Sequence, residues 1–425
     1  MNPQTNKRDI FVFAHWASLP EPRLMGTLHS ELLRGKEVFS FEYNEAWLHS
    51  EQVHLLDPDL QLYSGLHYLN DDRKVNFGLF LDSSPDRWGR ILMRRREAAL
   101  ARFEKRPEKN LFETDYLLGV YDEHRMGALR FKENLNEAFL NSDRKMATSP
   151  WASIRELEEI SLRLEEEDII DDPDYLKWLS MLITPGSSLG GGRPKASVTD
   201  HDRQLWIAKF PSKKDQTDVG AWEIVTYEMA IKSGINMAKS TARKFSSPYH
   251  TFLTKRFDRT SRGERIHFAS AMTLLGYIDG QDYEEGASYL DLVEFIIKNG
   301  ANVKADLEEL WRRIVFSICV SNTDDHLRNH GFILTGQGWI LSPAFDINPV
   351  ETGTGLKLNI SENDNALDLE LAMEVHEQFR LDKKRAGKII GEVRKSVFNW
   401  RNIANKYGIS RTEQDLKALA FSRIG

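Results

Sequence analysis

The segment Ser321–Asp346, SNTDDHLRNHGFILTGQGWILSPAFD, decides how the rest of the chain is interpreted. Its first ten residues contain two Asp, two His and two Asn. Before it, apolar residues recur at helical spacing over 307–318. After its polar part, two short apolar runs flank a Gly336-Gln337-Gly338 turn. A polar loop is therefore predicted between a helix and a β-hairpin, and loops held by such rigid elements commonly carry catalytic groups.

The spacing within this loop matches that of a kinase catalytic loop. Asp324 and Asn329 form a D-x-x-x-x-N pattern, in which the Asp accepts the proton of the substrate hydroxyl and the Asn holds Mg²⁺. Asp346, just beyond the hairpin, stands where kinases keep a second metal-binding Asp. The alternative is that Asp324 and Asn329 only cap a turn. Because the hairpin and Asp346 follow in the kinase order, we favour phosphoryl transfer.

The composition is that of a globular protein of two or three domains. The 425 residues are 41% hydrophobic and 28% charged. The net charge of -7 provides no overall basic field that would favour nucleic acid as a direct partner. The single cysteine, Cys319, excludes an intrachain disulfide and a cysteine-based zinc site, and its apolar surroundings predict a buried thiol. No signal peptide and no apolar run of membrane-spanning length is evident, so we expect a cytoplasmic protein without membrane contact.

The N-terminal third is predicted to form an α+β unit over residues 1–135. The runs 10–14 and 38–43 have the composition or alternation of strands. Ser84-Pro85 is expected to begin a long helix that is rich in arginine. Its basic face either is solvated or meets an acidic partner or nucleic acid. Residues 136–150 have the composition of a linker.

A glycine-rich stretch and a lysine-bearing strand follow. Thr184–Lys195 carries three successive glycines, which let backbone N–H groups turn toward a phosphate, although a flexible connector has the same composition. Leu205–Phe210 is a predicted strand in which Lys209 shares an apolar face, where a lysine needs a counter-charge. Glu223, in the first turn of the next predicted helix, is the candidate partner. Glu228 points about 140° away round the same helix.

The remaining stretches complete the order found in kinases. Leu253–Arg259 is predicted to be a strand that runs into a turn, at the place of the hinge that holds adenine. Beyond Asp346 the chain is predicted to be mostly helical, including Met373–Val397, with a capping box Ser410-x-x-Glu413 before the last helix. The expected division is an N-terminal domain at 1–135, a linker at 136–150, a nucleotide-binding part at 151–260 and a helical C-terminal lobe with the catalytic loop at 261–425.

The order of five motifs resembles the HipA family of serine/threonine kinases, which are toxins of bacterial type II toxin–antitoxin modules. The motifs are GSSLGGGRPK, WIAKF, KRFDR, NTDDHLRNHGF and SPAFD. The resemblance spans nearly the whole chain, more loosely in the N-terminal domain. It implies an α+β fold class, with a small N-terminal α+β domain followed by a bilobal protein-kinase-like fold whose C-terminal lobe is mostly helical.

The resemblance also implies a role for each motif residue. It makes Asp324 the catalytic base, places Mg²⁺ on Asn329 and Asp346, and brings Lys209 to the phosphates of ATP, with Glu223 beside it. His326 would contact the nucleotide. The other implied nucleotide-binding residues are Gly190, Gly191, Gly192, Arg193, Pro194 and Lys195 in the ATP loop and Lys255, Arg256 and Phe257 in the hinge.

Regulation and partners are implied by the same resemblance. Ser188 falls where the family carries an autophosphorylated serine, whose modification ejects the loop and switches off the kinase. Family members phosphorylate a protein such as an aminoacyl-tRNA synthetase. They are neutralised by a helix-turn-helix antitoxin, HipB, which binds the operator, so association with DNA would be indirect.

Two departures and two alternatives accompany this hypothesis. Asp325 follows Asp324 where the family commonly has a small residue, and Arg265–Ser270 replaces a polar segment that the family often shows. A small-molecule phosphotransferase of the aminoglycoside-kinase type uses a similar loop, but the domain preceding the glycine-rich stretch argues against it. A non-catalytic kinase-like protein that only binds an antitoxin is disfavoured because Lys209, Asp324 and the metal-binding pair are all present.

Overall fold

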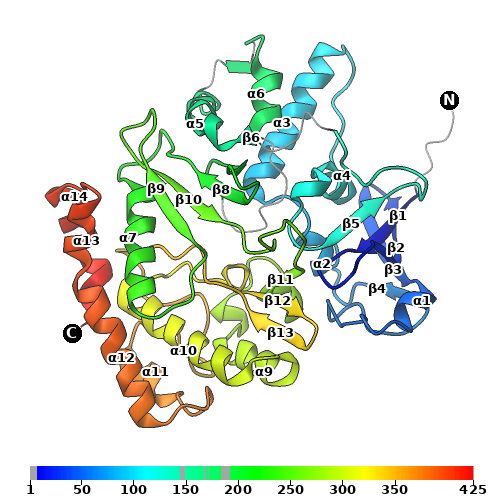
Figure 1. The fold of residues 1–425 in the computed structure, drawn as a ribbon. Coiled ribbons are helices and arrows are strands. Elements are labelled where there is room, and N and C mark those ends of the chain that lie inside the picture. The colour runs from blue at the N-terminus through cyan, green and yellow to red at the C-terminus, as the bar shows by residue number, and fades with distance from the viewer. Residues whose placement is uncertain (1–6, 144–148, 167–168, 171, 183–191, 425) are drawn as a thin grey trace. The chain divides into compact units, whose positions relative to one another are not determined.

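The computed structural model describes residues 7–143, 149–166, 169–170, 172–182 and 192–424 (Figure 1). The chain forms two compact units. The first comprises residues 1–207 and 258–278, and the second comprises residues 208–257 and 279–425. The chain therefore passes between the units three times, first within strand β8 (Leu205–Lys209). The four-part division expected from the sequence stays a prediction.

The first unit begins with an antiparallel sheet in the strand order β4-β3-β2-β1-β5, drawn in blue and cyan in Figure 1. Ile10, Val12 and Ala14 alternate along β1 and are fully buried, as is Phe41 of β3. This alternation is the pattern that predicted both strands. The strands are β1 (Lys7–Ala14), β2 (Arg23–Leu33), β3 (Lys36–Tyr43), β4 (Leu66–Tyr68) and β5 (Leu129–Lys132).

The arginine-rich helix of the first unit is α3. It begins at Arg87 with Asp86 as N-cap, whose carboxylate accepts from the Gly89 N–H at 2.9 Å. The predicted start at Ser84 is wrong because the Ser84 hydroxyl donates to the Phe80 carbonyl at 2.8 Å. Helix α3 spans Arg87–Phe103. The other elements of this unit are α1 (Glu45–Leu48), α2 (Gly78–Leu81), α4 (Glu113–Gly119), β6 (Ser149–Pro150), α5 (Ile154–Arg163), α6 (Tyr175–Leu182), β7 (Lys195–Thr199), β11 (Phe268–Ser270) and α8 (Ala271–Leu274).

The second unit is built around helix α10, which packs against α9, α11 and α12. Trp311, Ile314 and Ile318 of α10 are fully buried, and so is Cys319, as predicted. Burial raises the pKa of the Cys319 thiol to about 12. The elements are α7 (Val219–Lys232), β9 (Ser240–Arg243), β10 (Thr251–Lys255), α9 (Tyr289–Asn299), α10 (Val303–Val320), β12 (Gly331–Thr335), β13 (Gly338–Leu341), α11 (Leu369–Glu374), α12 (Lys383–Phe398), α13 (Trp400–Lys406) and α14 (Arg411–Lys417).

Two predictions for the C-terminal helices need correction. The single helix expected over Met373–Val397 is divided into α11 and α12, because Arg380 adopts a left-handed conformation (φ 56°) and Asp382 caps the start of α12. Ser410 caps α14 as expected. The carboxylate of Glu413, however, accepts hydrogen bonds from the start of α7, at 2.8 Å.

The predicted hairpin after the polar loop is confirmed as β12 and β13. Its turn is shorter than expected, since Thr335 already pairs with Gly338. Gly338 has a φ of 123°, and a Cβ there would lie 2.7 Å from the Asn299 carbonyl oxygen, so only glycine fits. No helix in the described part of the chain is long and apolar enough to cross a membrane.

Candidate active site

The predicted catalytic loop starts where α10 ends. Ser321 caps this helix in a left-handed conformation with a φ of 49°. Its hydroxyl donates to the Ala420 carbonyl at 2.9 Å, and its own carbonyl accepts from the Val350 N–H at 3.1 Å. The turn that starts the loop is therefore held by two segments that come much later in the sequence.

The adjacent aspartates of the loop occupy different environments. Asp324 is exposed, whereas Asp325 is buried. The Nδ2 of Asn329 donates to the Asp324 carbonyl at 2.9 Å, which closes the D-x-x-x-x-N pair directly. The Oδ1 of Asn329 is buried and has no hydrogen-bond partner among the described residues. The loop thus offers one exposed carboxylate and one buried amide oxygen with its acceptor capacity unused.

Asp325 ties the loop to the helices behind it. Its carboxylate accepts from the Tyr289 hydroxyl at 2.6 Å and the Ser317 hydroxyl at 3.3 Å, and it lies 3.1 Å from the His330 Nε2. Burial alone would raise the pKa of Asp325, but His330 and then Tyr289 outweigh it and lower this pKa. Sequence reasoning noted Asp325 only as a departure and missed this network. No local spacing rule connects Asp325 with Tyr289, 36 residues earlier.

Lys209 joins two carboxylates at the end of β8. Its Nζ lies 2.6 Å from the Oε1 of Glu223 and 2.6 Å from the Oδ1 of Asp346. Burial by itself would lower the pKa of Lys209, but attraction by Asp346 and then Glu223 outweighs burial, so this pKa is raised. The lysine is therefore charged at neutral pH. Its predicted counter-charge, Glu223, is confirmed, and Asp346 is a second one.

The start of α7 determines which glutamate reaches Lys209. A Cβ at Gly220 would lie 2.1 Å from the His250 carbonyl oxygen, so the helix can begin this close to residue 250 only with glycine. Glu223, in the first turn, is thereby buried and directed at the lysine. Glu228, the other candidate, pairs instead with Lys406.

Asp346 has an uncommon backbone conformation. Its φ is 56°, which costs a non-glycine residue about 1–3 kcal/mol and is typical of functional sites. Asn348 donates from Nδ2 to the Asp346 Oδ1 at 3.1 Å, and its own N–H donates to the Asn322 Oδ1 at 3.2 Å. Asn348 is a second residue that sequence reasoning missed. Its proximity to Asp346 in the sequence was the only available sign.

The predicted hinge lies in the second unit at the end of β10. The Lys255 N–H donates to the Lys239 carbonyl at 2.7 Å, Arg256 is buried, and the Phe257 ring lies 5.7 Å from the Phe345 ring. His326, at the start of the short helical turn 327–329, has a buried Nδ1 without a partner in the described part of the chain. The nucleotide contacts expected of these residues stay predictions.

The predicted ATP loop is described only from Gly192 onward. Ser188, Gly190 and Gly191 lie outside the described residues. Gly192 is exposed, Arg193 is partly exposed and Pro194 is buried. Lys195 is buried, and its Nζ lies 2.6 Å from the Asp86 Oδ2 within the first unit. The contact with ATP that was expected of Lys195 stays a prediction, and the structure shows this lysine as the ion-pair partner of Asp86.

The oxygen donors in the second unit suit Mg²⁺. The unpartnered Oδ1 of Asn329 and the carboxylate of Asp346 are the ligand types that this cation prefers, with further positions taken by water and nucleotide phosphates. Within the described ranges, no group of three or more His, Cys, Asp and Glu side chains could hold a metal ion. The protein's contribution to a magnesium site would therefore be one carboxylate and one amide.

Comparison with solved structures shows a shared fold. The chain superimposes on HipA from the Shewanella oneidensis MR-1 complex of HipA, HipB and operator DNA, with a TM-score of 0.63 and 18% identity over 98% of this chain and 95% of that one. This likeness concerns the fold alone and confirms the predicted fold class, a mixed α+β chain with an N-terminal antiparallel sheet and a kinase-like fold.

Sequence comparison shows the family of this chain through a match to residues 187–400. A curated Haemophilus influenzae protein named "Putative kinase" is 26% identical over 165 residues, which cover 35% of this chain. The match spans about half of that relative, 48% of its length. The family model described as "HipA-like C-terminal domain" matches residues 187–400, which is half of the 425 residues. The matched range contains Lys209, Glu223, Asp324, Asn329 and Asp346. The chain therefore belongs to the HipA family.

Proposed function

We propose that this chain is a serine/threonine protein kinase that uses ATP and Mg²⁺ and acts as the toxin of a HipBA-like module. The observation that carries the proposal is the ion pairing of Lys209 with both Glu223 and Asp346. The same compact unit holds the exposed Asp324, bonded through its carbonyl to Asn329. A lysine, a helical glutamate and this pair of loop residues are the parts that protein kinases use for phosphoryl transfer.

Each of these residues has a defined task in the proposed reaction. The hydroxyl oxygen of the protein substrate forms a bond to the γ-phosphorus of ATP, and the bond to the bridging oxygen breaks, so ADP leaves with that electron pair. Asp324 accepts the hydroxyl proton. Lys209 carries the positive charge that faces the phosphates. Asn329 and Asp346 would hold Mg²⁺, which when bound neutralises phosphate charge. Asp325 touches no substrate and acts by holding the loop in place.

Phosphoproteomics after expression tests the activity and identifies the target together. Cells that express the wild-type chain are compared with cells that express Asp324→Ala at the same level. We expect new phosphoserine or phosphothreonine on one protein of the translation machinery, such as an aminoacyl-tRNA synthetase, only with the wild type. Identical phosphoproteomes from the two strains, with purified wild-type protein also inactive toward ATP, would exclude the proposed kinase.

A helix-turn-helix antitoxin is the proposed partner. The Shewanella oneidensis complex contains HipA, HipB and operator DNA, and the acidic net charge of this chain agrees with contact to DNA only through such a partner. Co-expression with a helix-turn-helix protein encoded next to this chain should yield a stable complex and restore growth. The complex should shift operator DNA in a gel, whereas the kinase alone should not.

We further propose that Ser188 is autophosphorylated and that the modified protein binds ATP weakly. A phosphate beside Gly190–Gly192 adds about -1.5 to -2 charges, which would repel the phosphates of ATP from the loop. Peptide mass spectrometry after incubation with ATP and Mg²⁺ should find the phosphate on Ser188, or on the neighbouring Ser187. Active protein without either modification, or full ATP affinity after modification, would contradict this regulation.

A further inference from the structure

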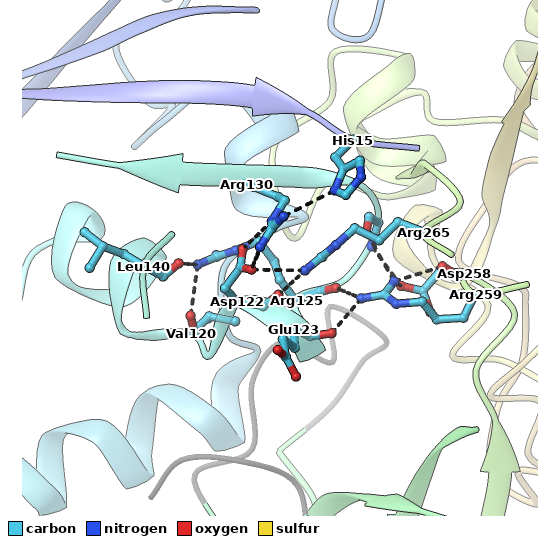
Figure 2. Close-up of polar contacts among 11 residues, drawn as sticks. His15, Val120, Asp122, Glu123, Arg125, Arg130, Leu140, Asp258, Arg259 and Arg265 are labelled. Atoms are coloured by element: carbon cyan, nitrogen blue, oxygen red, sulfur yellow. Dashed lines mark hydrogen bonds and ion pairs between the residues drawn. The ribbon is translucent and has the colours of Figure 1, made fainter. Parts of the chain in front are cut away.

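A cluster of arginines in the first unit has more positive charge than its carboxylates neutralise. Arg125 and Arg130 come from the segment around η1 (Asp122–His124) and β5, and Arg259 and Arg265 come from the segment 258–265 (Figure 2). Asp122 and Asp258 lie among them, and both are buried. None of these residues belongs to the proposed kinase site.

Two of the four guanidinium groups are occupied by the protein itself. Arg125 donates to four backbone carbonyls at 2.7–3.0 Å. Arg259 donates to the carbonyls of Gly127, Glu123 and Arg125 and to the Asp258 carboxylate, the last at 2.7 Å. Figure 2 shows Arg125 bonded to the carbonyls of Val120 and Leu140, and Arg259 bonded to the carbonyl of Glu123 and to Asp258. These two arginines therefore fix the backbone of the cluster.

The other two arginines share one carboxylate. Arg130 is ion-paired with Asp122 and also lies 3.3 Å from the His15 Nδ1. Arg265 donates from Nη2 to the Asp122 carbonyl at 2.6 Å and to its Oδ2 at 3.3 Å. The Nη1 of Arg265 is buried and has no hydrogen-bond partner among the residues that the structure describes. One carboxylate thus serves two guanidinium groups and leaves a buried donor unsatisfied.

A pocket of about 420 Å³ is lined in part by Arg265, the residue that carries this buried donor. Its lining includes Arg130, Arg203, Arg259 and Arg265, with Glu123 as the only carboxylate that lines it within the described ranges. Arg203, in the turn between β7 and β8, is exposed, and its guanidinium has no partner in the described part of the chain. All lining residues belong to the first unit.

The charge balance identifies the kind of ligand. Arg125 does not line the pocket, but its charge acts on Arg265. Four arginines and the carboxylate of Glu123 line the pocket. When Arg125 and the buried Asp122 and Asp258 are added, this set of five arginines and three carboxylates has an excess of two positive charges. Burial lowers the pKa of Arg265 to about 10, although Asp122 opposes this, so the guanidinium keeps its charge at neutral pH. A buried cation of this kind needs an anion.

We propose that this pocket binds the phosphate group of a small molecule, held by Arg265, Arg203 and Arg130. A phosphomonoester carries nearly two negative charges and three acceptor oxygens at neutral pH, which matches the excess charge and the exposed guanidinium of Arg203. Planar guanidinium groups bind phosphate through paired N–H groups. The volume lies in the range of pockets that hold a small metabolite.

Calorimetry with inorganic phosphate as the probe tests this site. The full chain is titrated at low ionic strength, without ATP, and compared with Arg203→Gln and Arg265→Gln. We expect the wild type to bind phosphate. The affinity of Arg203→Gln for phosphate should be lower by about tenfold or more, because one charge-assisted contact is lost. The exposed Arg102 of α3, outside the pocket, provides the matched control Arg102→Gln, which should bind phosphate as the wild type does.

The variants also separate binding from folding. Arg203 is exposed, so Arg203→Gln should melt at the wild-type temperature without phosphate, whereas phosphate should raise the melting temperature of the wild type only. Tighter binding of glycerol 3-phosphate than of inorganic phosphate would assign the site to an organic phosphate, and equal binding would assign it to free phosphate. No binding by the wild type, equal binding by Arg203→Gln, or equally tight binding of malonate would overturn the proposal.

Discussion

The Lys209 cluster of the second unit and the arginine cluster of the first unit differ in the sign of their excess charge. In the second unit, one cation, Lys209, faces two carboxylates, Glu223 and Asp346. In the first unit, Arg130 and Arg265 share the single carboxylate of Asp122. Charges withdrawn from water need compensation. The excess negative charge beside Lys209 supports the proposed Mg²⁺ site, and the excess positive charge of the arginine cluster supports the proposed phosphate site.

The largest expected effect concerns the proposed kinase site. Asp324→Ala should lower kcat by about 10²- to 10⁴-fold, since a positioned proton acceptor contributes that much to the rate. ATP affinity should be nearly unchanged because the Asp324 side chain is exposed and belongs to neither the Lys209 pairs nor the metal-binding pair. Steady-state kinetics and ATP calorimetry on one preparation measure both quantities. A dead Asp325→Ala beside an active Asp324→Ala would show that the assignment is wrong by one residue.

The neighbouring aspartate should affect stability instead. Asp325→Ala removes the buried acceptor of the Tyr289 hydroxyl and the carboxylate that lies 3.1 Å from His330, and we expect the free energy of unfolding to fall by about 3–5 kcal/mol. Asp325→Asn keeps an acceptor oxygen and should recover part of this loss. Urea unfolding of the two variants and the wild type measures the difference. Wild-type stability in Asp325→Ala would mean that the network does not hold the loop.

One negative charge can be removed from the cluster that Lys209 forms with Glu223 and Asp346. Asp346→Asn should reduce the gain in ATP affinity that Mg²⁺ provides by roughly tenfold or more, because even outer-shell partners of metal ligands contribute about 10- to 100-fold. Calorimetry with and without Mg²⁺ isolates this gain. Asn348→Ala, which removes only a hydrogen bond to the Asp346 Oδ1, is the matched control and should have a smaller effect. An unchanged dependence on Mg²⁺ in Asp346→Asn would remove Asp346 from the metal site.

The smallest expected effect concerns how stability depends on pH near the arginine cluster of the first unit. His267, two residues after Arg265, is buried, and burial, followed by the charge of His54, lowers its pKa to about 3. The native state thus keeps His267 neutral while the unfolded state binds a proton near pH 6.5. Stability from this group is present above pH 6.5 and is lost as the pH falls toward 3.

His267→Gln removes that proton uptake. Between pH 7 and pH 5.5 the wild type should lose about 1 kcal/mol more stability than the variant, from a pKa difference worth about 1.4 kcal/mol per unit. Urea midpoints at the two pH values measure the change in each protein, so a constant loss from the substitution cancels. Equal changes in both proteins would show that His267 is not the responsible group.

Much of the site could be predicted because its members lie in short motifs. Asp324 and Asn329 are five residues apart, and the structure brings them together through a bond from the Asn329 amide to the Asp324 carbonyl. Glu223 was chosen over Glu228 from helical periodicity, and the structure agrees. Predictions of helix caps failed where a side chain bonds to a partner outside the helix that it was expected to cap. Ser84 bonds to the preceding turn rather than capping α3, and Glu413 bonds to α7 rather than completing a capping box.

The sequence by itself determined the elements and the order of the kinase motifs, since apolar periodicity and the spacing of polar residues reflect helix, strand and turn geometry over a few residues. Only the tertiary structure decided that Asp346 reaches Lys209 across 137 positions and that Arg265 reaches Asp122 across 143. No local sequence pattern relates residues that are so far apart along the chain. Which charges are withdrawn from water together depends on how the whole chain packs, and that packing gives one cluster an excess of negative charge and the other an excess of positive charge.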